Sequence, residues 1–220
     1  MKMVVARRRP LTQAQVAAAG SLHSSLAQWQ ATDHALMRLQ EAMPGFGPAE
    51  TLLKVVAVNA LSGTRVLALQ RAAAHVQMVL ESADLATSDP ALVESLAEVP
   101  TTPDGRPRRY VSFASKFAHF FVSSERFPIY DSYADRMLLF HLGPSAERNH
   151  ARPYEAFVRN IDTLRNECAI DCTYRELDRY LWVAGQYRAW TERKRGLNTE
   201  LSRVFENPSA EQQTLLRAIS

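Results

Sequence analysis

Apolar side chains recur at helical spacing along most of this 220-residue chain, and this pattern limits the possible folds more than any other feature. Between 174 and 184 the apolar side chains form one stripe on a helix, made of Tyr174, Leu177, Tyr180, Leu181 and Ala184. No segment sustains the alternation of apolar and polar residues that is typical of a strand, and no Asn-Gly or Asp-Gly turn joins two such segments. The sequence therefore predicts an all-α protein.

Capping residues, prolines and glycines divide the chain into predicted helices. Thr12 is a predicted N-cap of a helix that continues, with a break at Gly20, towards Met43, where Pro44-Gly45-Phe46-Gly47-Pro48 ends it. Besides a helix around Lys116 and two terminal helices capped by Asn198 and Ser209, we expect helices at 49–60, 65–82, 90–99, 131–142, 152–169 and 173–195. We expect one domain of two lobes: a central lobe at about 49–142, and a second lobe built from 1–48 and 143–220.

The composition is that of a soluble globular protein, with 46% apolar and 22% charged residues. No run approaches the roughly 20 apolar residues of a membrane span, and the first nine residues lack the apolar run of a signal peptide. Cys168 and Cys172 are too few for a four-cysteine iron–sulfur cluster and have no ligand pair to complete a zinc site. We expect a cytoplasmic monomer that uses no metal or other cofactor and has no membrane partner.

Arginine dominates the positive charge of the chain, which has a net charge of +3 and only four lysines. Arginine favours planar, bidentate contact with phosphate groups. The arginines come in groups, and one of them, with Arg106, Arg108 and Arg109, directly precedes the helix that carries Lys116. We interpret Arg108 and Arg109 as contacts to a nucleic-acid backbone, with a solvated charged face as the alternative.

Lys116 and Asp131 are the two residues whose surroundings point most clearly to chemistry. Lys116 lies among phenylalanines at helical spacing, so its stem should be packed and its amine partly dehydrated, which favours a nucleophilic role. Asp131 follows the extended segment 127–130 and precedes a helical pattern, which predicts an N-cap carboxylate held ionised near the positive end of a helix. The alternatives are a surface lysine and a plain helix cap.

The segment from Ser112 to Met137 resembles the helix-hairpin-helix DNA glycosylases related to the 8-oxoguanine glycosylases. In this resemblance Ser112-Phe113-Ala114-Ser115-Lys116 takes the place of the family's hairpin and lysine, and Pro128-Ile129-Tyr130-Asp131-Ser132 takes the place of its aspartate segment. The resemblance implies a two-lobed helical fold, with Lys116 and Asp131 as catalytic residues. It also implies that Ser112, Ala114 and Ser115 contact DNA.

The segment from Leu53 to His75 resembles the helix, polar loop and helix that these enzymes insert into the minor groove opposite a flipped base. The resemblance implies that Asn59 and Arg65 fill the gap left by the base and that Arg65 contacts the orphaned partner base; a plain interhelical turn is the alternative. Three further residues are candidates for the base pocket or else ordinary core residues: His119, Tyr130 and His141.

The resemblance implies a DNA glycosylase that flips a modified or damaged base out of double-stranded DNA and cuts its N-glycosidic bond. If Lys116 forms a Schiff base, the enzyme is also a lyase, and a modified phage base is one hypothesis for its substrate. Two other functions stay open. One is a non-catalytic DNA-binding protein of the same fold, and the other is an all-helical protein-interaction module in which Lys116 and Asp131 form an ion pair.

Overall fold

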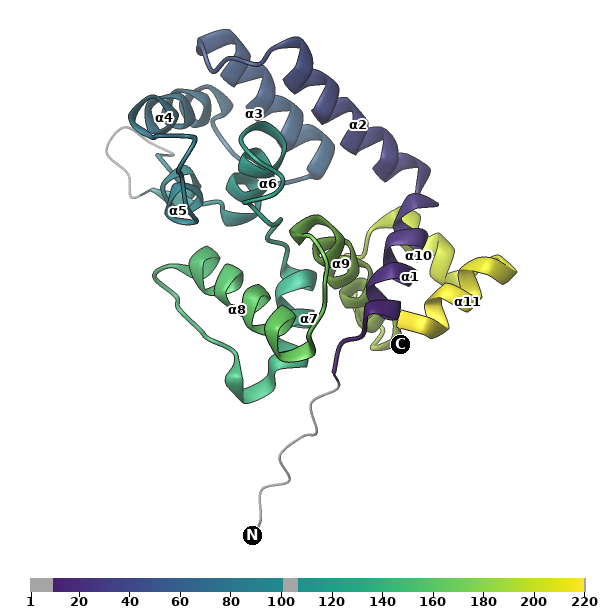
Figure 1. Ribbon diagram of the computed structural model, residues 1–220. Coiled ribbons are helices and arrows are strands. Elements are labelled where there is room, and N and C mark those ends of the chain that lie inside the picture. Colours follow the sequence, from purple (N-terminus) through teal and green to yellow (C-terminus); the bar gives the residue numbers. More distant parts are fainter. Residues whose placement is uncertain (1–9, 101–106, 220) are drawn as a thin grey trace. The chain divides into compact units, whose positions relative to one another are not determined.

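A computed structural model describes residues 10–100 and 107–219 of the chain, and helices make up most of them (Figure 1). The all-α prediction is confirmed. The chain divides into two compact units, which alternate along the sequence. The first unit contains residues 1–27, 131–148 and 156–220, and the second contains 28–130 and 149–155. The expected central lobe at 49–142 therefore differs from the second unit at both of its ends.

The first unit is organised around one long helix, α9. Its elements are α1 (Gln13–Ser24), α7 (Ser132–Leu142), the 3-10 turn η1 (Gly143–Ser145), most of α8 (Pro153–Cys168), α9 (Tyr174–Thr191), α10 (Thr199–Glu206) and α11 (Ala210–Ile219). Helix α9 packs against α1, α7 and α10, and α1 also packs against α11 (Figure 1). The predicted apolar stripe of α9 supplies much of this core, since Leu177, Tyr180 and Leu181 are fully buried.

The second unit packs short helices around α3 and α6. Its elements are α2 (Ala27–Ala42), α3 (Pro48–Ser62), α4 (Leu69–Ser82), α5 (Ala91–Ala97), β1 (Glu98–Val99), β2 (Arg108–Arg109) and α6 (Val111–Phe121). Helix α3 packs against α4 and α6, while α5 packs against the same two helices. The core between them consists of fully buried side chains that include Val55, Val58, Ala72, Val76, Leu96, Phe113 and Phe117.

The helix starts agree with the sequence where a side chain caps them. Thr12 and Thr173 form capping boxes at the starts of α1 and α9, and Asn198 caps α10. Ser209 accepts a hydrogen bond from the backbone N–H of Gln212 at 3.1 Å, next to the start of α11. Each cap satisfies a backbone N–H that has no partner inside its helix.

Several elements differ from the prediction, and α4 begins at Leu69 and not at 65. The first helix ends at Ser24 and not at Gly20, because Gly20 lies in open space where a helix tolerates glycine. Helix α9 ends at Thr191 because Arg193 adopts a left-handed conformation (φ 55°), which stops the helical repeat. The prediction also missed β1 and β2, which pair antiparallel with Val99 opposite Arg108. Strands of two residues are too short to show an alternating pattern.

Within the described part of the chain, no helix is both long enough and apolar enough to cross a membrane.

Candidate functional site

Lys116 lies on a helix that is buried on nearly all sides. Every residue of α6 from Phe113 to His119 is buried, because the helix is apolar around most of its circumference and packs against both α3 and α5. The Lys116 side chain keeps only 8% of its surface exposed. The predicted packing of this lysine is therefore confirmed.

The residues that directly precede Lys116 and Asp131 are hydrogen-bonded to each other. Ser115 is fully buried, and its hydroxyl oxygen accepts a hydrogen bond from the backbone N–H of Tyr130 at 3.0 Å. Because Tyr130 is covalently joined to Asp131, this bond fixes the end of the segment that leads to the aspartate.

Two more side chains hold the same extended segment in place. The buried ring of His119 bonds through Nδ1 to the carbonyl oxygen of Phe127 at 2.8 Å, and the Tyr154 hydroxyl donates to the carbonyl oxygen of Pro128 at 2.8 Å. A carbonyl oxygen can only accept, so Nδ1 of His119 carries the proton. The segment 127–130 is therefore held at three of its four residues.

Asp131 caps the first helix that follows this segment. Its backbone is extended, and its carboxylate accepts a hydrogen bond from the N–H of Tyr133 at 2.7 Å at the start of α7. The predicted N-cap is confirmed. A carboxylate in this position faces the positive end of the helix dipole. Asp131 begins a segment of the first unit, whereas Lys116 belongs to the second.

The hairpin implied by the resemblance is not formed by the residues assigned to it. Ser112, Ala114 and Ser115 all lie inside α6, and Ala114 and Ser115 expose no surface. Direct DNA contact by these two side chains is therefore a wrong expectation. The physical reason is local, since serine and alanine avoid the positive φ that a Gly-x-Gly turn needs and continue a helix instead.

The two described arginines before α6 have different surroundings. The guanidinium of Arg109 bonds to a carboxylate oxygen of Glu98 at 2.8 Å and to the carbonyl oxygen of Ala151 at 2.7 Å, so it holds parts of the second unit together. Arg108 is exposed, lies over the Tyr110 ring, and makes no hydrogen bond within the described residues. Arg108 is therefore the better placed of the two for a phosphate. Arg106, the third arginine of this group, lies outside the described residues.

The loop between α3 and α4 is built by Asn59. Its side-chain oxygen accepts hydrogen bonds from the Thr64 hydroxyl at 3.0 Å and from the backbone N–H of Val66 at 2.7 Å. These bonds close the turn, so Asn59 shapes the loop. Two non-glycine residues of the loop, Arg65 and Ala68, have positive φ values of 56° and 53°. Such conformations are strained, and strain of this kind clusters at functional sites.

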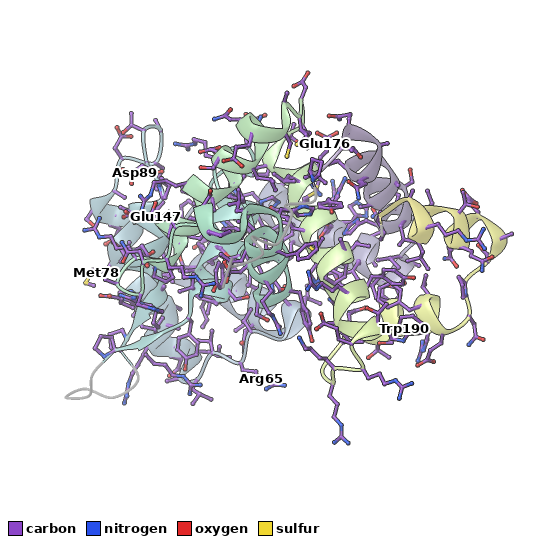
Figure 2. The ribbon with its side chains drawn as sticks, turned by 90° about the horizontal axis from the view of Figure 1, so that it is seen from below. Arg65, Met78, Asp89, Glu147, Glu176 and Trp190 are labelled. Carbon is purple, nitrogen blue, oxygen red and sulfur yellow. The ribbon has the colours of Figure 1, made fainter. Side chains whose placement is uncertain are left out.

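The same loop presents Arg65 and Leu67 to solvent. Arg65 is exposed at the surface (Figure 2), and it makes no hydrogen bond or ion pair with the described residues. Leu67, which the sequence reading missed, keeps 57% of its surface exposed while Val66 beside it is buried. Two consecutive apolar residues, Val66 and Leu67, in a loop between two helices were the signal that could have found it, because a short loop rarely buries both. Minor-groove proteins place arginines in the groove and insert apolar side chains such as leucine between base steps, so an exposed leucine two residues after an exposed arginine suits such a contact.

The two candidate histidines are buried and hydrogen-bonded, which supports the core alternative for both. His119 bonds to Phe127 as described above, and His141 bonds through Nε2 to the Tyr180 hydroxyl at 2.8 Å. Tyr130 is half-buried, with its backbone N–H bound to Ser115. The structure thus gives each of the three a structural role.

The described residues contain no cluster of three or more histidine, cysteine, aspartate or glutamate side chains that could hold a metal ion. Cys168 ends α8, and Cys172 is buried in the following loop. Burial raises the pKa of the Cys172 thiol, which disfavours the thiolate that metals bind.

Comparison with known proteins links the chain to a family. An uncharacterized protein of Haemophilus influenzae is 31% identical over 135 residues, and the match covers 58% of this chain and 62% of that protein. No solved structure matches the chain. The family model named HI_0787_N, described as an N-terminal domain, matches residues 15–125, which is half of the chain and extends from α1 through α6. The protein therefore belongs to the HI_0787_N family.

Proposed function

We propose that the protein is a DNA glycosylase that flips a modified base out of double-stranded DNA and cleaves its N-glycosidic bond. Lys116 and Asp131 are the catalytic residues in this proposal. The observation that carries it is the hydrogen bond between Ser115 and Tyr130, because this bond joins the residues directly before Lys116 and Asp131. The bond itself lies within the second unit, where the buried Ser115 fixes the residue that precedes Asp131, and catalysis requires reacting groups whose chain segments are fixed.

The proposed reaction uses a lysine and a carboxylate in separate roles. The neutral amine of Lys116 attacks C1′ of the sugar while the N-glycosidic bond breaks, and the base leaves with the bonding electron pair and takes up a proton. Positive charge grows on the sugar in the transition state, and the ionised Asp131 stabilises it. Loss of a proton from the lysine nitrogen and opening of the sugar ring then give a Schiff base. If water replaces Lys116 as the nucleophile, the enzyme is monofunctional.

The loop at 63–68 supports the DNA-binding part of the proposal. Its exposed leucine and arginine suit contact with a base stack in the minor groove, and its strained backbone is fixed by the hydrogen bonds to Asn59. Arg108 adds an exposed cation in the same unit that is free to meet a phosphate.

Base release from a panel of modified duplexes and modified phage genomes, read by mass spectrometry, tests the proposal. Asp131→Asn keeps a capping oxygen, so the fold should survive while base release falls by about two to four orders of magnitude. Lys116→Gln should abolish the adduct that borohydride traps, because only an imine can be reduced in this way. Asp171→Asn, which alters an exposed loop carboxylate, is the matched control and should keep full activity.

A non-catalytic DNA-binding protein is the second candidate, because the exposed Arg65, Leu67 and Arg108 serve binding alone equally well. It predicts salt-dependent DNA binding by the parent without release of any base. Equal activity of the parent, Asp131→Asn and Lys116→Gln would place the active site elsewhere. A parent that neither releases a base nor binds DNA at low salt would favour the protein-interaction module.

A further inference from the structure

The first unit contains a pocket of about 340 Å³ that the proposed glycosylase chemistry does not use. It is walled by α7, by α9 and by the turn that follows α9, with Arg148 at its edge. Four cationic side chains line it, namely Arg136, Arg148, Arg188 and Lys194. Glu192 is the carboxylate among the lining residues, and apolar side chains of α7 complete the wall.

Two of the arginines are held in fixed orientations. Arg136 donates from Nε to the carbonyl oxygen of Ser132 at 2.7 Å, and its guanidinium lies over the Tyr133 ring at 4.7 Å. Arg188 donates from Nε to Glu192 at 3.0 Å and lies over the Phe140 ring at 3.8 Å. Each arginine thus uses one edge for its support and keeps further N–H groups for a ligand.

Arg148 is positioned through its backbone. The neighbouring Glu147 donates its N–H to the side chain of Asn160 at 2.8 Å and accepts from the same side chain through its carbonyl at 2.9 Å. Arg148 itself is exposed and makes no hydrogen bond or ion pair within the described residues. Asp135 lies near Arg136 and Arg148, and burial raises the pKa of this carboxyl, so its neutral form is favoured more than usual.

The turn after α9 brings Lys194 to the pocket at the cost of backbone strain. Arg193 adopts φ 55°, a conformation normally left to glycine at the end of a helix. This allows the N–H of Lys194 to bond to the carbonyl of Ala189 at 2.9 Å, while the Tyr133 hydroxyl donates to the carbonyl of Gly196 at 2.9 Å. The turn is therefore fastened to α7, and Glu192 accepts hydrogen bonds from both Arg188 and Lys194.

We propose that this pocket binds a phosphate monoester of about the size of one nucleotide. A single carboxylate ligand would not match four cations, whereas a doubly charged phosphate offers oxygens for several arginine contacts at once. The volume lies at the small end of the roughly 300–1,000 Å³ of ligand pockets, which suits one small molecule or one chain end. The phosphate could belong to a free nucleotide or to the 5′ end of a DNA strand, and these share the same chemistry. This inference does not depend on glycosylase activity.

Isothermal titration of the full chain at constant ionic strength tests the proposal. Thymidine 5′-monophosphate and inorganic phosphate are the free probes, thymidine is the uncharged control, and a short DNA strand with and without a 5′-phosphate is the second arm. We expect the phosphorylated probe of at least one arm to bind, and its unphosphorylated counterpart to bind at least about tenfold more weakly. Arg148→Gln and Arg188→Gln should each weaken that binding by about tenfold, the effect of losing one charge-assisted contact.

Arg203→Gln on α10 is the matched control, because it removes the same charge from an exposed position outside the pocket and should leave binding unchanged. Arg148→Gln is the safer pocket variant, since Arg188 also packs on Phe140. Stronger binding of the 5′-phosphorylated strand than of the free nucleotide identifies a DNA end as the source and supports the site. The proposal would be overturned if thymidine bound as tightly as thymidine 5′-monophosphate, or if no phosphorylated probe bound at millimolar concentration. Undiminished binding by both pocket variants would also overturn it.

Discussion

The buried Lys54 should make the free energy of unfolding of the second unit rise with pH. The side chain is fully buried on α3, where Nζ donates to the carbonyl oxygen of Gly45 at 2.7 Å and lies 4.2 Å from the centre of the Phe46 ring. Burial lowers the pKa of Lys54 from 10.5 to about 8, with Glu50 opposing part of this effect. The folded protein therefore holds this proton less tightly than the unfolded chain does.

The sign of the effect follows from proton counting. Between pH 8 and pH 10.5 the unfolded chain keeps its proton on Lys54 while the folded protein loses it, so the free energy of unfolding rises with pH. Below pH 8 both states are charged and the folded state carries the whole cost of the buried charge. With these two pKa values, we expect Lys54 to add about 2.5 kcal/mol to the free energy of unfolding between pH 7 and pH 10.

Urea unfolding of the parent and of Lys54→Met at pH 7, 8, 9 and 10 isolates this contribution, because all other titrating groups are common to both proteins. Methionine leaves the Gly45 carbonyl without its donor, which costs about 1–3 kcal/mol at every pH and does not alter the slope. The parent-minus-variant difference should therefore rise with pH by about 2.5 kcal/mol. Lys194→Met serves as the exposed-lysine control. A difference that stays constant from pH 7 to pH 10 would refute the claim that burial destabilises the charged amine.

Three further outcomes are expected. Gly185→Ala places a Cβ atom 2.4 Å from the carbonyl oxygen of Tyr133 and should lower the free energy of unfolding, measured by calorimetry, by about 1–3 kcal/mol. Gly20→Ala, whose Cβ atom meets open space, should raise it by roughly 0.5–1 kcal/mol. Equal Tm values for the two variants would disprove the contact. Burial, aided by two nearby arginines, lowers the pKa of His23 from 6.5 to about 4. The unfolded chain therefore binds a proton at this residue before the folded protein does, and the free energy of unfolding should fall by about 3 kcal/mol as the pH falls from above 6.5 to 4. His23→Gln should flatten this slope, and an NMR titration that finds an ordinary pKa for the His23 ring would contradict it. Leu67→Ser should reduce base flipping, read by a fluorescent base analogue, by about tenfold while non-specific DNA binding is kept, and unchanged flipping would rule out the wedge role.

The parts of the fold that could be predicted are those decided by short-range chemistry. Thr12, Asp131, Thr173 and Asn198 each satisfy a backbone N–H within three residues of themselves, so the sequence alone locates the helix starts. The packed environment of Lys116 could be predicted because the apolar residues around it on the same helix mark α6 as a helix that neighbouring helices bury on most sides.

The parts that could not be predicted depend on partners far along the chain. Arg109 looks like a free phosphate ligand in the sequence, but its guanidinium reaches the carbonyl groups of residues 150 and 151, about forty positions away. His141 likewise finds its partner in Tyr180 on another helix. The pocket lined by Arg188 and Lys194 depends on a left-handed arginine at 193, a conformation that sequence propensity assigns to glycine.

The two buried lysines of the second unit serve different ends. The amine of Lys54 donates to the Gly45 carbonyl and lies against an aromatic ring, so this side chain holds the turn before α3. Its pKa is lowered, but the side chain is fully buried and no substrate can reach it. Lys116 keeps part of its surface exposed, and the serine beside it is bonded to the residue before Asp131. A lowered pKa such as that of Lys54 is common in nucleophilic lysines, but the geometry favours Lys116 as the nucleophile. The borohydride adduct of the proposed enzyme should therefore map to Lys116, with Lys54 bearing on stability alone.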